Sequence, residues 1–98
     1  MKTGWLLYED SDLAQNRDFA AYLETEALRR GMRLETVRTA QLTLGVRQGG
    51  ALSIRRDGRE SLPGYVISRQ RDALVSEQFE RLGVPVFNCA RVCAVCTD

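Results

Sequence analysis

The chain contains no histidine among its 98 residues. Catalytic Ser-His-Asp and Cys-His systems and imidazole metal ligands are therefore excluded within this sequence. No apolar run approaches the ~20 residues that a membrane-spanning helix needs. The opening residues, Met1-Lys2-Thr3-Gly4, do not follow the pattern of a signal peptide. We expect no membrane partner.

An excess of charge of one sign is also missing. Fourteen Lys and Arg oppose thirteen Asp and Glu, for a net charge of +1. Proteins that bind nucleic acid usually carry a clear basic excess, so we expect no nucleic-acid partner. The three cysteines are few and odd in number, which argues against a secreted disulfide framework. A reducing, cytoplasmic location is the expected one.

The glycine-rich phosphate-binding loops are absent as well. No G-x-x-x-x-G-K-[ST] motif occurs, and no G-x-G-x-x-G follows the first apolar run. Gly49-Gly50 falls between two short alternating segments, where turn geometry explains it. We therefore expect no nucleotide bound in the usual glycine loop.

The composition that remains is that of a globular domain, with 44% apolar and 28% charged residues. This length is typical of one domain, covering residues 1–98. Apolar runs alternate with helical patterns along it. Strands are predicted at 5–8, 34–37, 65–68 and 84–87, and helices from Asn16 to residue 30 and from Asp72 to residue 82. Gly31 and Gly83 are the expected helix stops.

These helices have predicted caps and predicted inner faces. Asn16 and Asp72 are the expected capping side chains, and residues 9–12 read as a polar loop. The residues expected to face inward are Phe19, Tyr22, Leu23, Ala27 and Leu28 on the first helix and Leu74, Val75, Phe79 and Leu82 on the second. Pro85 cannot donate a ladder hydrogen bond, so the last strand should lie at an edge of its sheet or begin at Pro85.

Residues 42–62 interrupt the alternation and predict a small β-hairpin excursion, with short strands around 44–46 and 52–54. After Asn88 a third helix is expected. The whole order predicts an α/β fold with an open, mostly parallel sheet flanked by helices.

Polar clusters follow three of the predicted strands, at 9–16, 68–72 and Asn88. The carboxyl ends of parallel strands share one edge of a sheet, and ligands of open α/β sheets bind there. Arg69 and Arg71 could hold a carboxylate or phosphate through bidentate hydrogen bonds. Helix caps and solvated loop charges are the simpler alternative.

The cysteines form the pattern Cys89-x3-Cys93-x2-Cys96. This is the ligand spacing of a radical-SAM iron–sulfur cluster. The same residues are i, i+4 and i+7 on one face of a helix, where free cysteine packs as a small apolar residue. We favour packing, and we expect no metal ligand in the chain.

The stretches 62–72 and 82–88, the latter continuing to Asp98, resemble the N-terminal segment of RimK-like ATP-grasp ligases, a family that includes glutathione-synthetase-like and ribosomal-protein-glutamylating enzymes. Residues 4–8, Asn16 and the hairpin excursion are similar to that pattern too. The resemblance implies a Rossmann-like pre-ATP-grasp domain. It further implies that the chain is a fragment of a longer ligase, which joins a carboxylate to an amine through an acylphosphate.

In such an enzyme ATP and magnesium are held by later domains, so the resemblance implies no cofactor and no catalytic residue in this chain. Arg69, Arg71 and Asn88 match family positions that face the active-site cleft, and Asn16 matches less closely; these are the candidate substrate-binding residues. The implied partners are the remaining ATP-grasp domains and a small-molecule or peptide substrate. An exposed sheet edge also allows a homo-oligomer.

Two other functions remain open from the residues themselves. One is a stand-alone Rossmann-like or receiver-like module that binds a ligand or partner. A receiver needs a phosphoacceptor Asp at the end of a central strand, where this chain has Ser68 and Asn88. The other is an iron–sulfur protein that uses the three cysteines.

Overall fold

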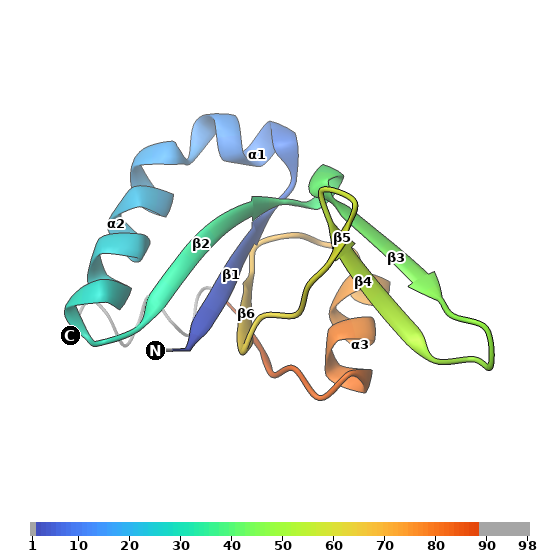
Figure 1. Ribbon diagram of the computed structural model, residues 1–98. Coiled ribbons are helices and arrows are strands. Elements are labelled where there is room, and N and C mark those ends of the chain that lie inside the picture. The colour runs from blue at the N-terminus through green and yellow to red at the C-terminus, as the bar shows by residue number, and fades with distance from the viewer. Residues whose placement is uncertain (1, 89–98) are drawn as a thin grey trace.

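The computed structural model describes residues 2–88 (Figure 1). Its elements, in chain order, are β1 (Thr3–Tyr8), α1 (Asp10–Gln15), α2 (Arg17–Arg29), β2 (Arg33–Arg38), the 3-10 helix η1 (Thr39–Gln41), β3 (Leu42–Val46), β4 (Leu52–Arg56), β5 (Arg59–Glu60), β6 (Tyr65–Ser68), α3 (Ala73–Arg81) and β7 (Val86–Asn88). In the described part of the chain, no helix has the length and apolar character needed to cross a membrane.

A parallel sheet forms the centre of the fold, with the strand order β2-β1-β6-β7. The prediction of a mixed α/β fold with a parallel sheet is therefore confirmed. β7 lies at an edge, as expected from the proline that directly precedes it. The edge position removes the need for a ladder hydrogen bond from Pro85.

Both faces of this sheet are buried, and β1 supplies both cores by alternation. Leu6 and Tyr8 belong to a cluster with α1 and α2, whereas Trp5 and Leu7 belong to a second cluster with β4 and α3. Figure 1 shows α2 and α3 on opposite sides of the sheet. The continuous apolar run at 5–8 is thus explained by a strand that is covered on both sides.

The hairpin excursion is a separate antiparallel sheet with the order β3-β4-β5. The two predicted strands are present, and the short β5 adds a third. α3 is joined to this sheet by Gln78, whose Nε2 donates to the carbonyl groups of Gly45 at 3.2 Å and Ser53 at 3.0 Å. The excursion therefore covers the same side of the molecule as α3.

The region before α2 differs from the prediction. Residues 9–12 are not a loop, because α1 begins at Asp10. Asp10 and Asp12 lie in its first turn, where negative charge is stabilised by the helix dipole, and Leu13 is buried. Asn16 does precede α2, but its side chain does not cap that helix; its Nδ2 donates instead to the Asp12 carbonyl at 2.7 Å. Its amide therefore closes α1.

The inner faces of the helices were predicted too broadly. On α2 the buried residues are Ala20, Leu23 and Ala27, whereas Leu28 is 60% exposed and Tyr22 is also exposed. On α3, Phe79 is fully buried but Leu74 is 70% exposed. Leu74 precedes Phe79 by five residues, which places it about 140° away around the helix.

Candidate functional site

A polar hollow of about 360 Å³ lies at the carboxyl edge of the parallel sheet. Its lining residues come from the segment after β1, from the end of β6 and the loop after it, and from the last residue of β7. They are Asp12, Asn16, Ser68, Arg69, Gln70, Arg71 and Asn88. All four candidate substrate-binding residues of the sequence are thus brought together. Their role in substrate binding stays a prediction.

The position of the hollow follows from the strand order. From β1 the chain crosses to β2 on one side, and it later enters β6 on the other side of β1. The order therefore reverses between β1 and β6. In open α/β sheets this reversal leaves a crevice outside the carboxyl ends of the strands, and ligands bind there.

Arg69 is placed by main-chain and ring contacts. Its N–H donates to the Leu7 carbonyl at 2.9 Å, which extends the pairing of β6 with β1 past the end of β6. Its guanidinium carbon lies 5.7 Å from the centre of the Tyr8 ring and 5.8 Å from that of Phe19. Cation–π attraction at such distances orients the guanidinium beside the hollow.

Arg71 lines the hollow from the loop after β6, and Asn88 lines it from the end of β7. The Arg71 N–H donates to the Glu9 Oε1 at 3.3 Å, which joins the loop after β6 to the segment after β1. Asn88 ends β7 directly beside Ser68, its partner in the parallel pairing. The sheet register therefore places Asn88 at the same edge as the two arginines, where all three line the hollow.

The loop of residues 69–71 is held from within by Gln70, which is only 9% exposed. Its Nε2 donates to the Ser68 Oγ at 3.2 Å and to the Ser76 Oγ at 3.1 Å, and its Oε1 accepts from the Asp72 N–H at 2.6 Å. A buried side chain with both ends satisfied fixes the loop that carries the two arginines. No pattern in the sequence indicates this role, because a glutamine between two arginines is expected to be exposed.

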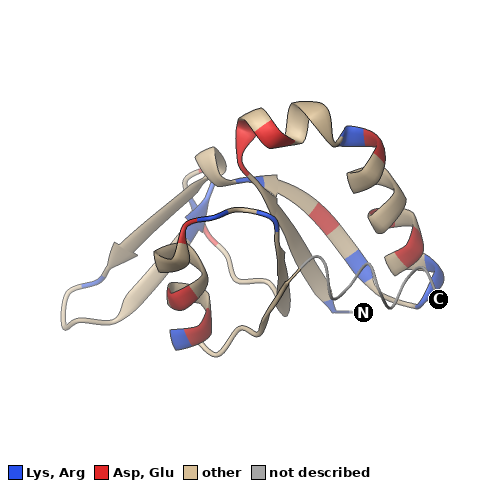
Figure 2. Ribbon diagram, turned by 180° about the vertical axis from the view of Figure 1, so that it is seen from behind, with Lys and Arg blue, Asp and Glu red and all other residues tan. Residues whose placement is uncertain are grey.

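The charges of the hollow favour an anionic group. Within residues 2–88, neither Arg69 nor Arg71 forms an ion pair with a carboxylate. Asp12 is the one negative side chain in the lining. Figure 2 shows the basic loop between β6 and α3 near the acidic start of α1. Two guanidinium groups can bind a carboxylate or phosphate in a bidentate manner.

The hollow does not suit a magnesium ion. Mg²⁺ prefers oxygen ligands, usually including carboxylates, and two nearby guanidinium groups oppose a second cation. Among residues 2–88 no group of three or more Cys, Asp or Glu side chains lies close enough to hold a metal. We therefore assign no metal chemistry to this edge. Cys89, Cys93 and Cys96 lie outside the described residues.

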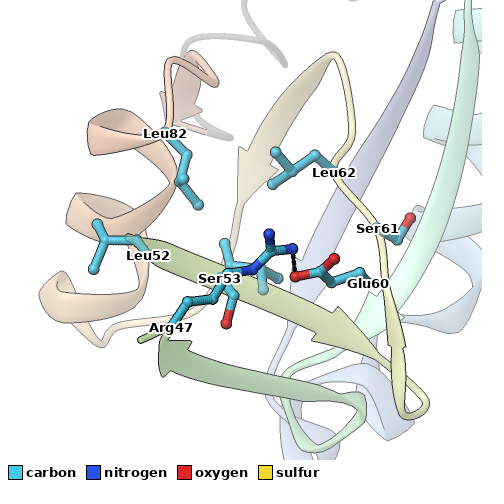
Figure 3. A pocket seen from close by; sticks show the side chains of 8 residues that line it. Arg47, Leu52, Ser53, Glu60, Ser61, Leu62 and Leu82 are labelled. Carbon is cyan, nitrogen blue, oxygen red and sulfur yellow. Dashed lines mark ion pairs between the residues drawn. The ribbon is translucent and has the colours of Figure 1, made fainter. Parts of the chain in front are cut away.

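A second hollow, of about 260 Å³, lies between the antiparallel sheet and the end of α3 (Figure 3). Arg47 and Glu60 supply its charged groups, and they form an ion pair with each other. Leu52, Ile54, Leu62 and Leu82 line much of the remainder. Because its charges neutralise each other, this hollow is the weaker candidate for a charged ligand.

Neither a protein-family model nor a curated protein matches this sequence.

Proposed function

We propose that this chain is the N-terminal domain of a RimK-like ATP-grasp carboxylate–amine ligase and lines the substrate side of the ligase cleft. In this proposal the chain is a Rossmann-like pre-ATP-grasp domain and is not catalytic alone. ATP and magnesium are bound by the later domains of the same polypeptide, where the amide bond forms through an acylphosphate. The chain contributes the groups that hold the substrate.

The fold supports this proposal through its layers. A four-stranded parallel sheet carries helices on both faces, and the strand order reverses beside β1. Doubly wound domains, which bind ligands at a sheet edge, share these features, and this supports the proposal. The antiparallel excursion between β2 and β6 agrees with the insertion that the resemblance implies.

The observation that carries the proposal is the convergence of Arg69, Arg71 and Asn88 in one hollow. The positions of these residues at predicted strand ends and the resemblance both select them, from two segments of the sequence. A hollow of about 360 Å³ is large enough for part of a small polar substrate. In the proposed ligase, Arg69 and Arg71 hold a carboxylate of the substrate while the reaction takes place in the neighbouring domains.

The size of the endogenous polypeptide tests the fragment relationship. An antibody raised against this chain should detect a polypeptide several times longer than 98 residues in the source cells. The purified polypeptide should release ADP from ATP only when a carboxylate and an amine substrate are both supplied. An endogenous product of the same length as this chain would overturn the proposal.

Calorimetry tests whether ATP is bound by the later domains and not by this chain. Titration of ATP with magnesium into the 98-residue chain should give no binding heat, because the nucleotide site belongs to the later domains. Tight binding of ATP to the chain alone would contradict the proposal. The same titration into the full polypeptide, with clear binding expected, is the matched control.

A stand-alone anion-binding module is the second candidate function. The specific observation in its favour is that the guanidinium groups of Arg69 and Arg71 form no ion pair within residues 2–88. Such a module would bind its ligand without ATP and would be produced at the length of this chain. The antibody experiment therefore separates the two functions.

A further inference from the structure

Within residues 2–88, no strand pairs with the outer edge of the antiparallel sheet, which is strand β3. The Arg47 N–H donates to the Ala51 carbonyl and the Asp57 N–H to the Gln41 carbonyl, so the odd-numbered residues of β3 face β4. The N–H and C=O groups of Leu44 and Val46 must then point away from β4. No hydrogen bond within residues 2–88 uses them. Figure 1 shows β3 on the outer side of its sheet.

The other described edges near it are protected. On β2, the outward N–H of Thr36 donates to the Glu24 Oε1 at 3.2 Å, and that of Arg38 donates to the Gln41 Oε1 at 2.9 Å. β5 is only two residues long, and both are charged. Natural sheets use side-chain cover, short edge strands and charge to prevent unwanted pairing. β3 has none of these devices and contains no proline.

The side chains of β3 are uncharged and divide by face. Leu42, Leu44 and Val46 share the face that carries Ile54, whereas Thr43 and Gly45 share the opposite face. Val46 is 68% exposed, whereas Leu42 and Leu44 on the same face are half-buried. An apolar row beside unpaired main-chain groups matches the way in which one strand adds to another.

We propose that β3 pairs antiparallel with β3 of a second copy of this chain, joining two antiparallel sheets across a two-fold axis at Leu44. In this register Leu44 faces Leu44 of the second copy, and Val46 faces Leu42. The Leu44 N–H donates to the opposite Leu44 carbonyl, and the Val46 N–H donates to the opposite Leu42 carbonyl, each twice by symmetry. An isologous contact of this kind closes as a dimer.

The sequence of β3 is self-complementary in this register. The apolar residues of the two strands meet on one face, and Thr43 meets the small Gly45 on the other. No like charges meet at the axis. Asp57, whose carboxylate accepts from the Gln41 side chain, lies by one end of β3, and Arg47 lies by the other. Arg47 is already paired with Glu60, so what favours a second copy is the match of the apolar rows and of Thr43 with Gly45.

The surface next to Leu44 extends the contact. A groove of about 530 Å³ is lined by Leu44, Leu52, Leu74, Glu77, Gln78 and Arg81. Leu74 is 70% exposed on the wall formed by α3. The two-fold axis at Leu44 places the two grooves side by side, so the proposed dimer covers the exposed leucine of each. This inference is independent of the proposed function.

Sedimentation velocity over a concentration series of the 98-residue chain tests the dimer. We expect the sedimenting species to change from one chain to two as the concentration rises. Val46→Pro removes an outward N–H without touching the β3–β4 ladder, and Val46→Lys places a charge beside the opposite Leu42. Each should raise the dissociation constant of the dimer at least about tenfold.

Two control variants distinguish this contact from non-specific association through exposed apolar residues. Val46→Thr keeps the N–H and the β-branched shape, so the dimer should persist. Leu28→Lys changes another exposed apolar residue, on α2, and should leave the dimer unchanged.

Hydrogen exchange should show that the Leu44 amide is protected only at high protein concentration. A chain that stays monomeric up to about 1 mM would overturn the proposal. A dimer that tolerates Val46→Lys, or a Leu44 amide that exchanges equally at all concentrations, would also overturn it.

Discussion

The Gln70 Nε2 donates to the Ser76 Oγ at 3.1 Å and thereby ties the loop after β6 to the body of α3. The same amide group also bonds Ser68, at the end of β6. A strand end, a loop and a helix are thus held by one buried side chain. The two arginines of the hollow are positioned by a residue that lies between them in the sequence.

Replacement of Gln70 by leucine should lower the free energy of unfolding by about 1–3 kcal/mol. The Asp72 N–H loses its acceptor, and the Ser68 and Ser76 hydroxyl oxygens lose the amide that donates to them. Urea unfolding followed by circular dichroism measures this loss. Gln48→Leu, at the exposed tip between β3 and β4, is the matched control and should change stability little. Equal effects of the two substitutions would show that the amide of Gln70 does not hold the loop.

Phe79→Ala should cost about 3–5 kcal/mol of unfolding free energy. Phe79 lies on the inner face of α3 and is fully buried. Its ring meets that of Trp5 edge to face at a centroid distance of 6.0 Å. Leu74→Ala, on the exposed side of the same helix, should cost less than about 0.5 kcal/mol. Urea titrations of both variants measure these changes. A small loss of unfolding free energy for Phe79→Ala would mean that α3 does not cover the sheet as described.

Gly4→Ala should destabilise the chain by about 1–3 kcal/mol. A methyl group at Gly4 would overlap the ring of Tyr65 on the neighbouring strand β6. A double-mutant cycle with Tyr65→Ser measures this coupling, because removal of the ring should relieve most of the cost. Equal costs of Gly4→Ala in the two backgrounds would locate the strain elsewhere.

Tyr65 should make the stability depend on alkaline pH. Burial raises the pKa of its hydroxyl above the usual 10.0, so the folded chain holds this proton more tightly than the unfolded chain does. Its contribution to stability is therefore complete below about pH 10 and is lost as the pH rises through the folded pKa. Tyr65→Phe lacks this dependence.

The same variant loses the hydrogen bond from the Tyr65 hydroxyl to the Arg33 carbonyl, of 3.1 Å, which is worth about 1 kcal/mol. Thermal unfolding of both proteins between about pH 8 and about pH 11 should show a difference in stability that narrows as the pH rises. A constant difference over that range would contradict a raised pKa for Tyr65.

Most of the parallel sheet could be predicted from the sequence, because its strands are short apolar or alternating segments separated by amphipathic helices. The run at 65–68 coincides with β6, and Asp72 caps α3 by accepting from the Leu74 N–H. α1 could not be predicted in the same way. Its six residues have only Leu13 buried, and acidic side chains in a first turn look the same as acidic side chains in a loop.

The position of the candidate site could be predicted from the sequence. The contacts that hold its side chains in place could not. The carboxyl ends of the strands of a parallel sheet meet at one edge, so the sequence predicts that Arg69 and Asn88 lie together. The rings of Tyr8 and Phe19 beside Arg69 depend on how α2 packs on the sheet. No local pattern in the sequence carries that information.

A titration of sodium glutamate into the isotope-labelled 98-residue chain, followed by amide chemical shifts, tests the central claim most directly. We predict saturable shifts that cluster at Asn16, Arg69, Arg71 and Asn88, and that disappear in a chain with both Arg69→Gln and Arg71→Gln but persist with Arg59→Gln on β5. No saturable shift up to about 50 mM glutamate, or shifts centred away from the carboxyl edge of the parallel sheet, would contradict the assignment of this hollow as the substrate-facing site.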